Sequence, residues 1–311
     1  MTKISVVMSV FNGARHLAGT IESILAQTET DFELIIIDDG SQDETPAILQ
    51  RFAAADPRIR VITVRNAGLT RALIAGCAAA TAPLIARQDA GDLSHPERLA
   101  KQAALFDRWP ELAFASCAVD FVGPGLEYLH SSRGQGATLV PKPILDITRI
   151  PPVLDGPSHH GAVLFRRDAY ERAGGYRSEF YYGQDWDLWY RLAEGGAFAR
   201  IPETLYTARI LPDSISTAAL ARQEAIAELS RTALVARQHG ESDAPILARA
   251  AAIGPVPRRT SRRRAAAGLY FIGEALRRNG DSRARGYLAR SAATWPFSVR
   301  TWIRYLQSLL P

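Results

Sequence analysis

The sequence contains two cysteines, Cys77 and Cys117, among its 311 residues. Two thiols cannot form the disulfide framework of a small secreted domain or the Cys-x-x-Cys pairs of a structural zinc site. There is no run of about 18 apolar residues, which excludes a transmembrane helix. Residues 1–11 lack the small-residue cleavage site of a signal peptide. These absences predict a cytoplasmic protein.

Three common catalytic motifs are also missing: G-x-x-x-x-G-K-[ST], H-E-x-x-H and G-x-S-x-G. G-x-G occurs at residues 123–125 and 134–136, but neither copy joins a predicted strand to a predicted helix. We therefore expect neither a P-loop nucleotide hydrolase nor a dinucleotide-dependent oxidoreductase.

Charge is distributed unevenly along the chain. The net charge is +5, but residues 218–311 carry 16 arginines and six acidic residues, a net +10, so that residues 1–217 carry −5. This asymmetry predicts a domain of residues 1–217 followed by a basic domain of residues 218–311. A basic domain favours an anionic partner, such as a membrane surface, nucleic acid or an acidic protein; the alternative is a solvated helical surface rich in arginine.

The first 120 residues alternate between apolar runs of strand length and helical patterns. Such alternation predicts an α/β fold with a doubly wound, mostly parallel sheet. The predicted strands are residues 4–11, 32–37, 59–64, 84–86, 114–121, 161–165 and 198–210. Residues 131–156 are rich in glycine and proline, which predicts a long functional or mobile loop.

No strand pattern follows residue 217, so we expect an all-helical C-terminal extension. Its predicted helices are residues 218–238, 265–278, 282–294 and 298–310. The last one has apolar residues at 299, 302, 303, 306, 309 and 310, with Arg300 and Arg304 elsewhere. This stripe either packs against its own domain or attaches to an anionic membrane, with contact through residues 258–311. The arginine cluster at 258–264 leaves nucleic acid as a weaker alternative, and we expect none.

Polar side chains follow each of the first four predicted strands. They are Asn12, Asp38, Asp39, Asn66, Asp89 and Asp92. Ligands of doubly wound sheets bind beyond the carboxyl ends of the strands. Carboxylates at 38–39 can accept hydrogen bonds from a base or ribose, and those at 89–92 can hold Mg²⁺ or Mn²⁺ together with phosphates. The alternative for both clusters is turn chemistry, with Ser41 and Glu44 forming a capping box.

A third acidic cluster, Gly183-Gln184-Asp185-Trp186-Asp187, precedes a predicted helix. A helix N-terminus keeps a carboxylate ionised and able to accept a proton. The cluster therefore predicts a general base, unless it is only a helix cap.

Taken in order, these motifs resemble the inverting family 2 glycosyltransferases of GT-A fold over about residues 3–217. The matching segments are ISVVMSVFNG at 4–13, IIIDDGSQDET at 35–45, NAGLTRAL at 66–73, RQDAGDLSHPERLAKQ at 87–102, HHGAVLFRRDAYERAGGYR at 159–177 and GQDWDLWYRL at 183–192.

The resemblance implies roles for several residues. Asp39, with Asp38, would hold the base or ribose of a UDP-, GDP- or dTDP-sugar. Asp89 would open a D-x-D-like element for Mn²⁺ or Mg²⁺. Asp185 would be the base that deprotonates an acceptor hydroxyl, on a saccharide or a lipid-linked acceptor, in surface polysaccharide or glycolipid assembly.

Three positions depart from the family pattern: Gly91, Gln184 and Leu211. Gly91 replaces the second Asp of D-x-D, so that either Asp92 takes the metal, or water mediates its binding, or metal dependence is weak. Gln184 replaces an acid before the base, and Leu211 replaces a histidine of some members.

Further candidates lie near these motifs. Asn12, Asn66 and Arg87 are predicted to contact the donor, although structural pairing is the alternative for Arg87. His159, His160, Gln184 and Trp186 are predicted to contact the diphosphate or acceptor, the alternatives being polar strand entry for the histidines and core packing for the tryptophan. Two rival functions are a nucleotidyltransferase and a catalytically weak interaction protein that works through its helical tail.

Overall fold

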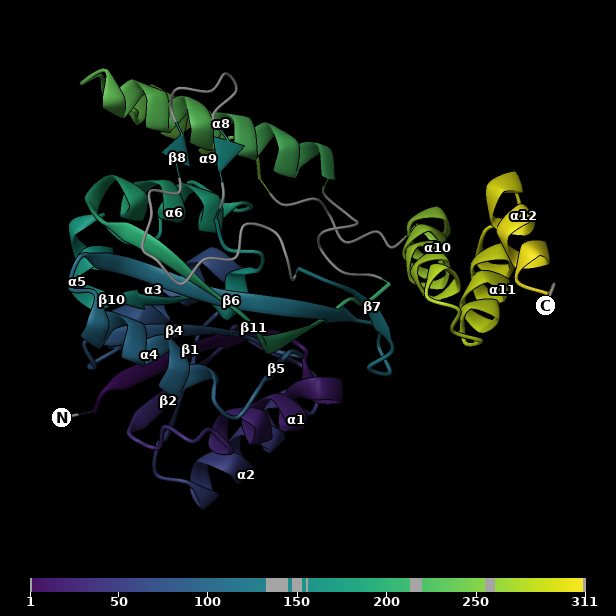
Figure 1. Ribbon diagram of the computed structural model, residues 1–311, viewed down its shortest axis with the longest axis horizontal. Helices are drawn as coiled ribbons and strands as arrows, with labels where there is room; N and C mark the ends of the chain where they lie inside the picture. Colours follow the sequence, from purple (N-terminus) through teal and green to yellow (C-terminus); the bar gives the residue numbers. More distant parts are fainter. Residues whose placement is uncertain are drawn as a thin grey trace. The chain divides into compact units, whose positions relative to one another are not determined.

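The computed structural model describes residues 2–132, 145–146, 153–154, 156–212, 220–254 and 261–309 (Figure 1). They belong to two compact units. The first takes in residues 1–119, 132–207 and 225–254, and the second takes in residues 120–131, 208–224 and 255–311.

The first unit is built on a mixed, mostly parallel sheet whose strand order is β3-β2-β1-β4-β10-β6-β11-β5. Strands β1 to β4 run parallel, whereas β10 is antiparallel to both β4 and β6. The strands are β1 Ile4–Val10, β2 Phe32–Asp38, β3 Ile59–Thr63, β4 Leu84–Asp89, β5 Leu93–Ser94, β6 Leu112–Val122, β10 Leu164–Arg166 and β11 Ala197–Arg209. The expected doubly wound α/β fold with C-terminal helices is confirmed.

The register of the central strands brings the predicted polar residues to one edge. β1 pairs Val10 with Asp38 of β2, and Ser9 with Asp89 of β4. Because parallel strands end at the same edge, the residues that follow β1, β2 and β4 lie close together.

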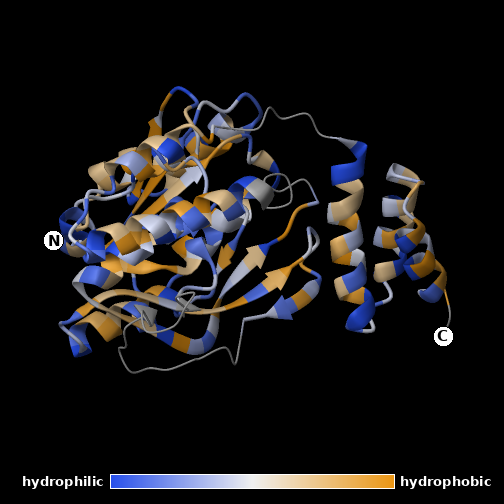
Figure 2. Ribbon diagram, turned by 90° about the horizontal axis from the view of Figure 1, so that it is seen from above, coloured by the Kyte–Doolittle hydropathy of each residue, from blue (hydrophilic) through white to orange (hydrophobic). Residues whose placement is uncertain are grey.

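Both faces of the sheet are covered by helices, which explains the nearly unbroken apolar sequence of its central strands. Helices α3 (Leu69–Ala79), α5 (Arg167–Arg172) and α6 (Gln184–Gly195) share a core with β1, β2 and β4 on one face. Helices α1 (Ala14–Leu25), α2 (Thr45–Ala55) and α4 (Arg98–Arg108) lie on the other face (Figure 1). Figure 2 shows the hydrophobic strands between these layers.

Two helices beyond residue 217 belong wholly or for the most part to the first unit. They are α8 (Leu220–Gln238) and α9 (Ala244–Ala251), of which α9 is missing from the predicted set. Ion pairs attach this segment: Arg237 of α8 contacts Glu194 at 3.0 Å, and Arg177 contacts Asp243 at 2.7 Å. The compact units therefore do not divide at residue 217.

The second unit contains a short strand and three helices. Strand β7 (Tyr128–Ser131) pairs with the end of β6, and the helices are α10 (Arg262–Arg278), α11 (Ala284–Thr294) and α12 (Val299–Gln307). Leu129 forms a core with Ile272, Leu276 and Ala284. Among the described helices of the chain, none is both long and apolar enough to cross a membrane.

Two local predictions were wrong. Ser41 and Glu44 form no capping box: α2 begins at Thr45 without a side-chain cap, and the hydroxyl of Ser41 accepts a hydrogen bond from the backbone N–H of Asn12 at 2.9 Å. The strand predicted at 161–165 is a 3₁₀ turn, His160–Ala162, followed by β10. Of the predicted loop at 131–156, much lies outside the described residues, which include a pairing of β8 (Leu145–Asp146) with β9 (Val153–Leu154).

Candidate active site

The first part of the site is the loop after β2, where Asp38 and Asp39 are buried. Asp38 accepts a hydrogen bond from the backbone N–H of Ser41 at 2.9 Å. Asp39 accepts bonds from the N–H groups of Ala67 and Gly68 at 2.9 and 3.0 Å. The two carboxylates thus shape both their own loop and the turn that opens α3.

Asn66 and Asn12 complete this loop cluster. The Asn66 amide donates to the carbonyl and carboxylate of Asp39 at 2.9 and 3.2 Å. The Asn12 side chain accepts from the N–H of Gln42 at 2.7 Å, and its backbone adopts φ 51°. A left-handed backbone is tolerated by asparagine better than by most residues. The loops after β1, β2 and β3 are therefore joined by asparagine and aspartate side chains.

The second part of the site is a cluster of Asp89, Asp92 and His159. One ligand atom from each lies within 4.8 Å of the others. His159 is 3.8 Å from each carboxylate. The hydroxyl of Tyr206 on β11 donates to Asp92 at 2.9 Å and accepts from the N–H of Asp89 at 3.1 Å. One tyrosine therefore fixes both ends of the Asp89–Asp92 turn.

Arginines compensate the charge of these carboxylates. Arg87, which is fully buried, pairs with Asp89, and Arg98, also buried, donates to Gln88 at 2.9 Å and lies over the Tyr206 ring at 5.1 Å. Burial alone would raise the pKa of Asp89, but the Arg87 guanidinium outweighs it and lowers that pKa to about 2. Asp89 is consequently ionised at neutral pH.

Two glycines shape the cluster in different ways. A Cβ on Gly161 would lie 2.0 Å from the Tyr206 hydroxyl and 3.1 Å from Asp89, so only glycine allows this approach. Gly91 has φ +105° and its nearest neighbour to a Cβ would be His16 at 3.9 Å. The second carboxylate of the family pattern is thus replaced by a turn in open space, and Asp92 points to the cluster instead.

The donor set fits a divalent cation. Around an octahedral Mg²⁺ or Mn²⁺ with bonds of about 2.1 Å, neighbouring ligands lie about 3 Å apart and opposite ones about 4.2 Å. The 3.8 Å between His159 Nδ1 and Asp89 falls within this range, whereas the 3.8 Å to Asp92 is measured from the other ring nitrogen, Nε2. Carboxylate oxygens suit Mg²⁺ and Mn²⁺, and an imidazole favours the transition metal. His159 Nδ1 accepts from the N–H of Gly161 at 3.1 Å, a bond that coordination through Nδ1 would replace.

The third part of the site is the N-terminus of α6, whose first turn contains two aspartates in different surroundings. Asp185 and Asp187 are two positions apart on a helix, so they face opposite sides. Asp187 is buried in an ion pair with Arg191 at 2.5 Å. Burial raises the pKa of Asp185, while the N–H of Trp186 acts in the opposite direction. Asp185 therefore combines partial burial with a higher proton affinity, as a general base requires.

The electrostatic influence of Asp89 and His159 reaches Asp185. Asp89 raises its pKa and His159 lowers it. The structure thus brings together the acidic cluster after β4 and the start of α6, although they are about a hundred residues apart in sequence.

The remaining predicted residues lie around α6. His160 is buried, and its ring nitrogen contacts the Tyr176 hydroxyl at 2.7 Å. Burial and then Arg87 lower the pKa of His160, which keeps its ring neutral. Gln184 is buried, and Trp186 packs partly into the core against Trp189, with ring centroids 4.9 Å apart. The structure thus places these three residues in the packing around α6.

Tyr206 and Gly161 are the functional residues that sequence reasoning missed. Tyr206 belongs to the predicted last strand, and its alternating pattern gave no sign of a polar contact. Leu211, the third departure from the family pattern, lies in the second unit.

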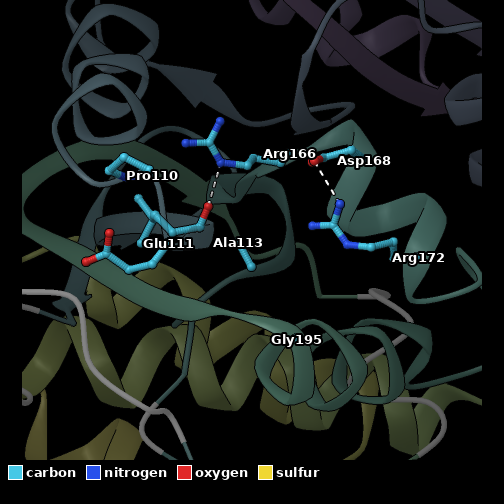
Figure 3. A pocket seen from close by; sticks show the side chains of 8 residues that line it. Pro110, Glu111, Ala113, Arg166, Asp168, Arg172 and Gly195 are labelled. Carbon is cyan, nitrogen blue, oxygen red and sulfur yellow. Dashed lines mark hydrogen bonds and ion pairs between the residues drawn. The ribbon is translucent and has the colours of Figure 1, made fainter.

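The described residues also line two cavities away from this edge. One of about 240 Å³ is lined by Glu111, Arg166, Asp168 and Arg172, among others (Figure 3). β10 pairs Arg166 with Leu84 at the start of β4, so this cavity lies at the amino ends of the parallel strands. Arg166 donates to the carbonyls of Leu112 and Phe106, and Arg172 pairs with Asp168. The side chains of both arginines are thus already paired.

Comparison with known proteins identifies the class of enzyme whose candidate site lies at the carboxyl ends of these strands. The family model described as glycosyl transferase family 2 matches residues 5–174. The chain belongs to glycosyl transferase family 2. It is therefore a glycosyltransferase, which removes the nucleotidyltransferase alternative.

Relatives of this glycosyltransferase cover most of the same region. EpsE of Bacillus subtilis (strain 168), which is named as a glycosyltransferase, is 35% identical over a region that covers 67% of this chain and 73% of EpsE. The amylovoran biosynthesis glycosyltransferase AmsE of Erwinia amylovora is 30% identical over 68% and 78%, respectively. The O-antigen biosynthesis glycosyltransferase WbnJ of Escherichia coli is 29% identical over 71% and 85%.

Solved structures share the GT-A fold of this glycosyltransferase. The mannosyltransferase PcManGT from Pyrobaculum calidifontis, in complex with GDP-Man and Mn²⁺, has a TM-score of 0.56 at 20% identity, over 99% of this chain and 84% of that chain. S. aureus TarS 1–349, in complex with UDP, has a TM-score of 0.52 at 14% identity, over 98% and 88%.

Proposed function

We propose that this enzyme transfers a sugar from a nucleotide-sugar donor to an acceptor hydroxyl with inversion at the anomeric carbon, and that Asp185 is its base. The observation that carries the proposal is the environment of Asp185. Unlike Asp187, which is buried in an ion pair with Arg191, Asp185 has no such partner among the described residues. Burial raises the pKa of Asp185, and the charge of Asp89 also acts on it. A single base beside the donor favours one in-line displacement, which inverts configuration.

In this proposal the loops after β1, β2 and β3 bind the nucleoside. Asp38, Asp39, Asn12 and Asn66 present carboxylate and amide groups at one edge, and both carboxylates have oxygen lone pairs beyond the backbone bonds described above. Arg87 is too buried to reach a phosphate without rearrangement, so we assign it the positioning of Asp89.

Asp89, Asp92 and His159 would hold Mn²⁺ or Mg²⁺, which stabilises charge on a leaving diphosphate. Asp89 is kept ionised by Arg87, and Tyr206 orients Asp92. Thus His159 would supply the third ligand that Gly91 and Leu211 do not. The PcManGT complex, which contains GDP-Man and Mn²⁺, supports a metal in the proposed reaction.

The acceptor we propose belongs to a growing surface polysaccharide or a lipid-linked saccharide. The names of AmsE and WbnJ, which refer to amylovoran and O-antigen biosynthesis, support this setting. We place the reaction in the cytoplasm, consistent with the buried free thiols of Cys77 and Cys117.

Replacing the proposed base is the decisive test. Asp185→Asn removes proton acceptance with almost no change in size, and we expect transfer to fall by about 10²–10⁴. The measurement is release of nucleoside diphosphate from UDP-, GDP- and dTDP-sugars, with water as the acceptor. Donor binding should persist, because the nucleoside loops are unchanged.

Asp168→Asn is the matched control, since Asp168 also lies in the first turn of a helix but pairs with Arg172 at the surface. It should leave the rate unaltered. The acid limb of the wild-type pH–rate profile should lie above the usual range of an aspartate, because burial raises the pKa of Asp185. Unchanged transfer by Asp185→Asn would refute the assignment of Asp185 as the base.

The donor class can be measured by thermal-shift titration with UDP, GDP, dTDP and CMP, with and without Mn²⁺. A ligand at about 100 times its Kd stabilises the folded state by about 2.7 kcal/mol. We expect one diphosphate to stabilise the protein, more strongly with Mn²⁺, and His159→Ala to remove the Mn²⁺ increment. An identical shift with and without Mn²⁺ would contradict the metal assignment but not the donor assignment.

A further inference from the structure

Helix α12 packs with its polar side inward. Thr301 is its buried residue, and its arginines reach α10: Arg300 lies over the Tyr270 ring at 4.9 Å, and Arg304 is 3.6 Å from Glu274. In a helix that merely completes a soluble domain, the apolar stripe would take this place. The apolar stripe of α12 therefore does not pack against α10 and α11, which was one of the two predicted roles for it.

The apolar stripe, which is formed by α12 and the residues that flank it, lies on the surface instead. Its side chains are 42–80% exposed, and they are Phe297, Val299, Trp302, Ile303, Leu306 and Leu309. Scattered apolar residues are normal at a surface, but four at helical spacing on α12, with one more on either side of the helix, form a patch that requires explanation. Figure 2 shows hydrophobic and hydrophilic residues interleaved along this helix near the C-terminus. Residue 310, the other predicted member, lies outside the described residues.

The ring of Trp302 can be removed from water without leaving its hydrogen-bond donor unsatisfied. Its indole N–H donates to the carbonyl of Pro296 at 2.8 Å, so the donor keeps its partner when the ring is desolvated. Tryptophan with one satisfied polar atom and an apolar ring is typical of the membrane–water interface.

Charge identifies the occupant of the stripe. Residues 261–309 contain ten arginines and two acidic residues, Glu274 and Asp281. Both acids already pair with arginines of the same unit, Glu274 with Arg277 and Asp281 with Arg283. Exposed arginines remain at 262, 263, 285, 290 and 300. Two copies of so basic a unit would repel each other, whereas an anionic bilayer attracts it by roughly 1 kcal/mol per basic residue near its surface.

We propose that the exposed stripe of α12 inserts into the headgroup region of an anionic phospholipid membrane, with the arginines of the second unit contacting the lipid phosphates. The stripe is convex and lies on a single helix, which suits a planar interface. This inference does not depend on the glycosyl transfer proposed above, because binding is measured without any donor.

The test is co-sedimentation of the full chain with vesicles. We expect binding to vesicles of phosphatidylcholine with about one-third phosphatidylglycerol, little binding to pure phosphatidylcholine, and weakening as salt rises. Ile303→Asp should lower the partition coefficient roughly tenfold or more, since the side chain leaves the apolar region. Leu306→Asp should act in the same way.

Val235→Asp is the matched control, because Val235 is a β-branched residue of similar exposure, 42% against 49% for Ile303, on α8 of the first unit. It should bind like the wild type, and the melting temperatures of all variants should agree. Equal binding to neutral and anionic vesicles, or unchanged binding by Ile303→Asp, would overturn the proposal. A wild-type dimer that Ile303→Asp separates, without vesicle binding, would assign the stripe to a second copy. Donor-induced thermal shifts, which test the proposed function, should be the same in every variant.

Discussion

Helices α6 and α12 are both amphipathic but have opposite relations to their surroundings. α6 buries Leu188, Trp189 and Leu192 against the sheet and presents Asp185 at its N-terminus. α12 buries Thr301 and leaves Trp302 and Ile303 exposed. Periodicity tells which residues share a helix face, but the neighbouring elements decide whether that face becomes a core or a contact surface.

The strongest test of this difference is one substitution made in both helices. Trp189→Ala should destabilise the folded protein by about 3–5 kcal/mol, because a large ring leaves a packed core. Trp302→Ala should cost far less, since that ring is 42% exposed. Chemical denaturation of the two variants measures both values. Similar losses would mean that α12 is packed as tightly as α6.

The attachment of α12 can be weakened from its polar side. Glu274 accepts hydrogen bonds from Arg277 and Arg278 and lies near Arg304, so Glu274→Gln should destabilise the second unit by about 1–3 kcal/mol. The exposed Glu224 of α8 provides a control, Glu224→Gln, which should change stability little. Hydrogen exchange of α10–α12 would locate the effect.

The same carboxylate gives a pH dependence. The hydrogen bond from Arg277, opposed by burial, lowers the pKa of Glu274 from 4.5 to about 2. A lowered pKa means that the stabilisation is complete above the ordinary value and is lost as the pH falls toward 2. The unfolding free energy of Glu274→Gln should therefore approach that of the wild type in acid. A difference that is constant with pH would contradict this.

The smallest expected effect is that of Ile303→Ala. An exposed apolar side chain contributes little to folding, so the change in stability should remain within about 0.5 kcal/mol. Vesicle binding should nevertheless weaken. Leu188→Ala in α6 should show the reverse, with a large stability loss and no change in membrane partition.

The sequence predicted the sheet well because its central strands are covered on both sides. Their unbroken apolar runs have one interpretation, and the polar residues after Val10, Asp38 and Asp89 follow from where the runs stop. The loops were harder, since Ser41 has a hydrogen-bond partner, Asn12 in the loop after β1, that no local pattern reveals.

Within the site, the carboxylates could be identified from the sequence but their partners could not. Arg87, Tyr206 and His159 reach Asp89 or Asp92 from three separate segments, and only Arg87 is adjacent in sequence. Periodicity also left open which face of α12 packs against its neighbours, because that depends on the side chains that α10 and α11 present to it.

The glycine at position 161 has a consequence for redesign of this enzyme. It gives the Tyr206 hydroxyl access to both carboxylates, and any larger residue would collide with that hydroxyl. Gly91 faces open space, but its φ of +105° strains any residue with a side chain. The two glycines therefore resist substitution for different reasons, position 161 because space is lacking and position 91 because of its backbone conformation. A library that seeks a new cation preference should keep both glycines and vary the proposed ligands Asp92 and His159 instead.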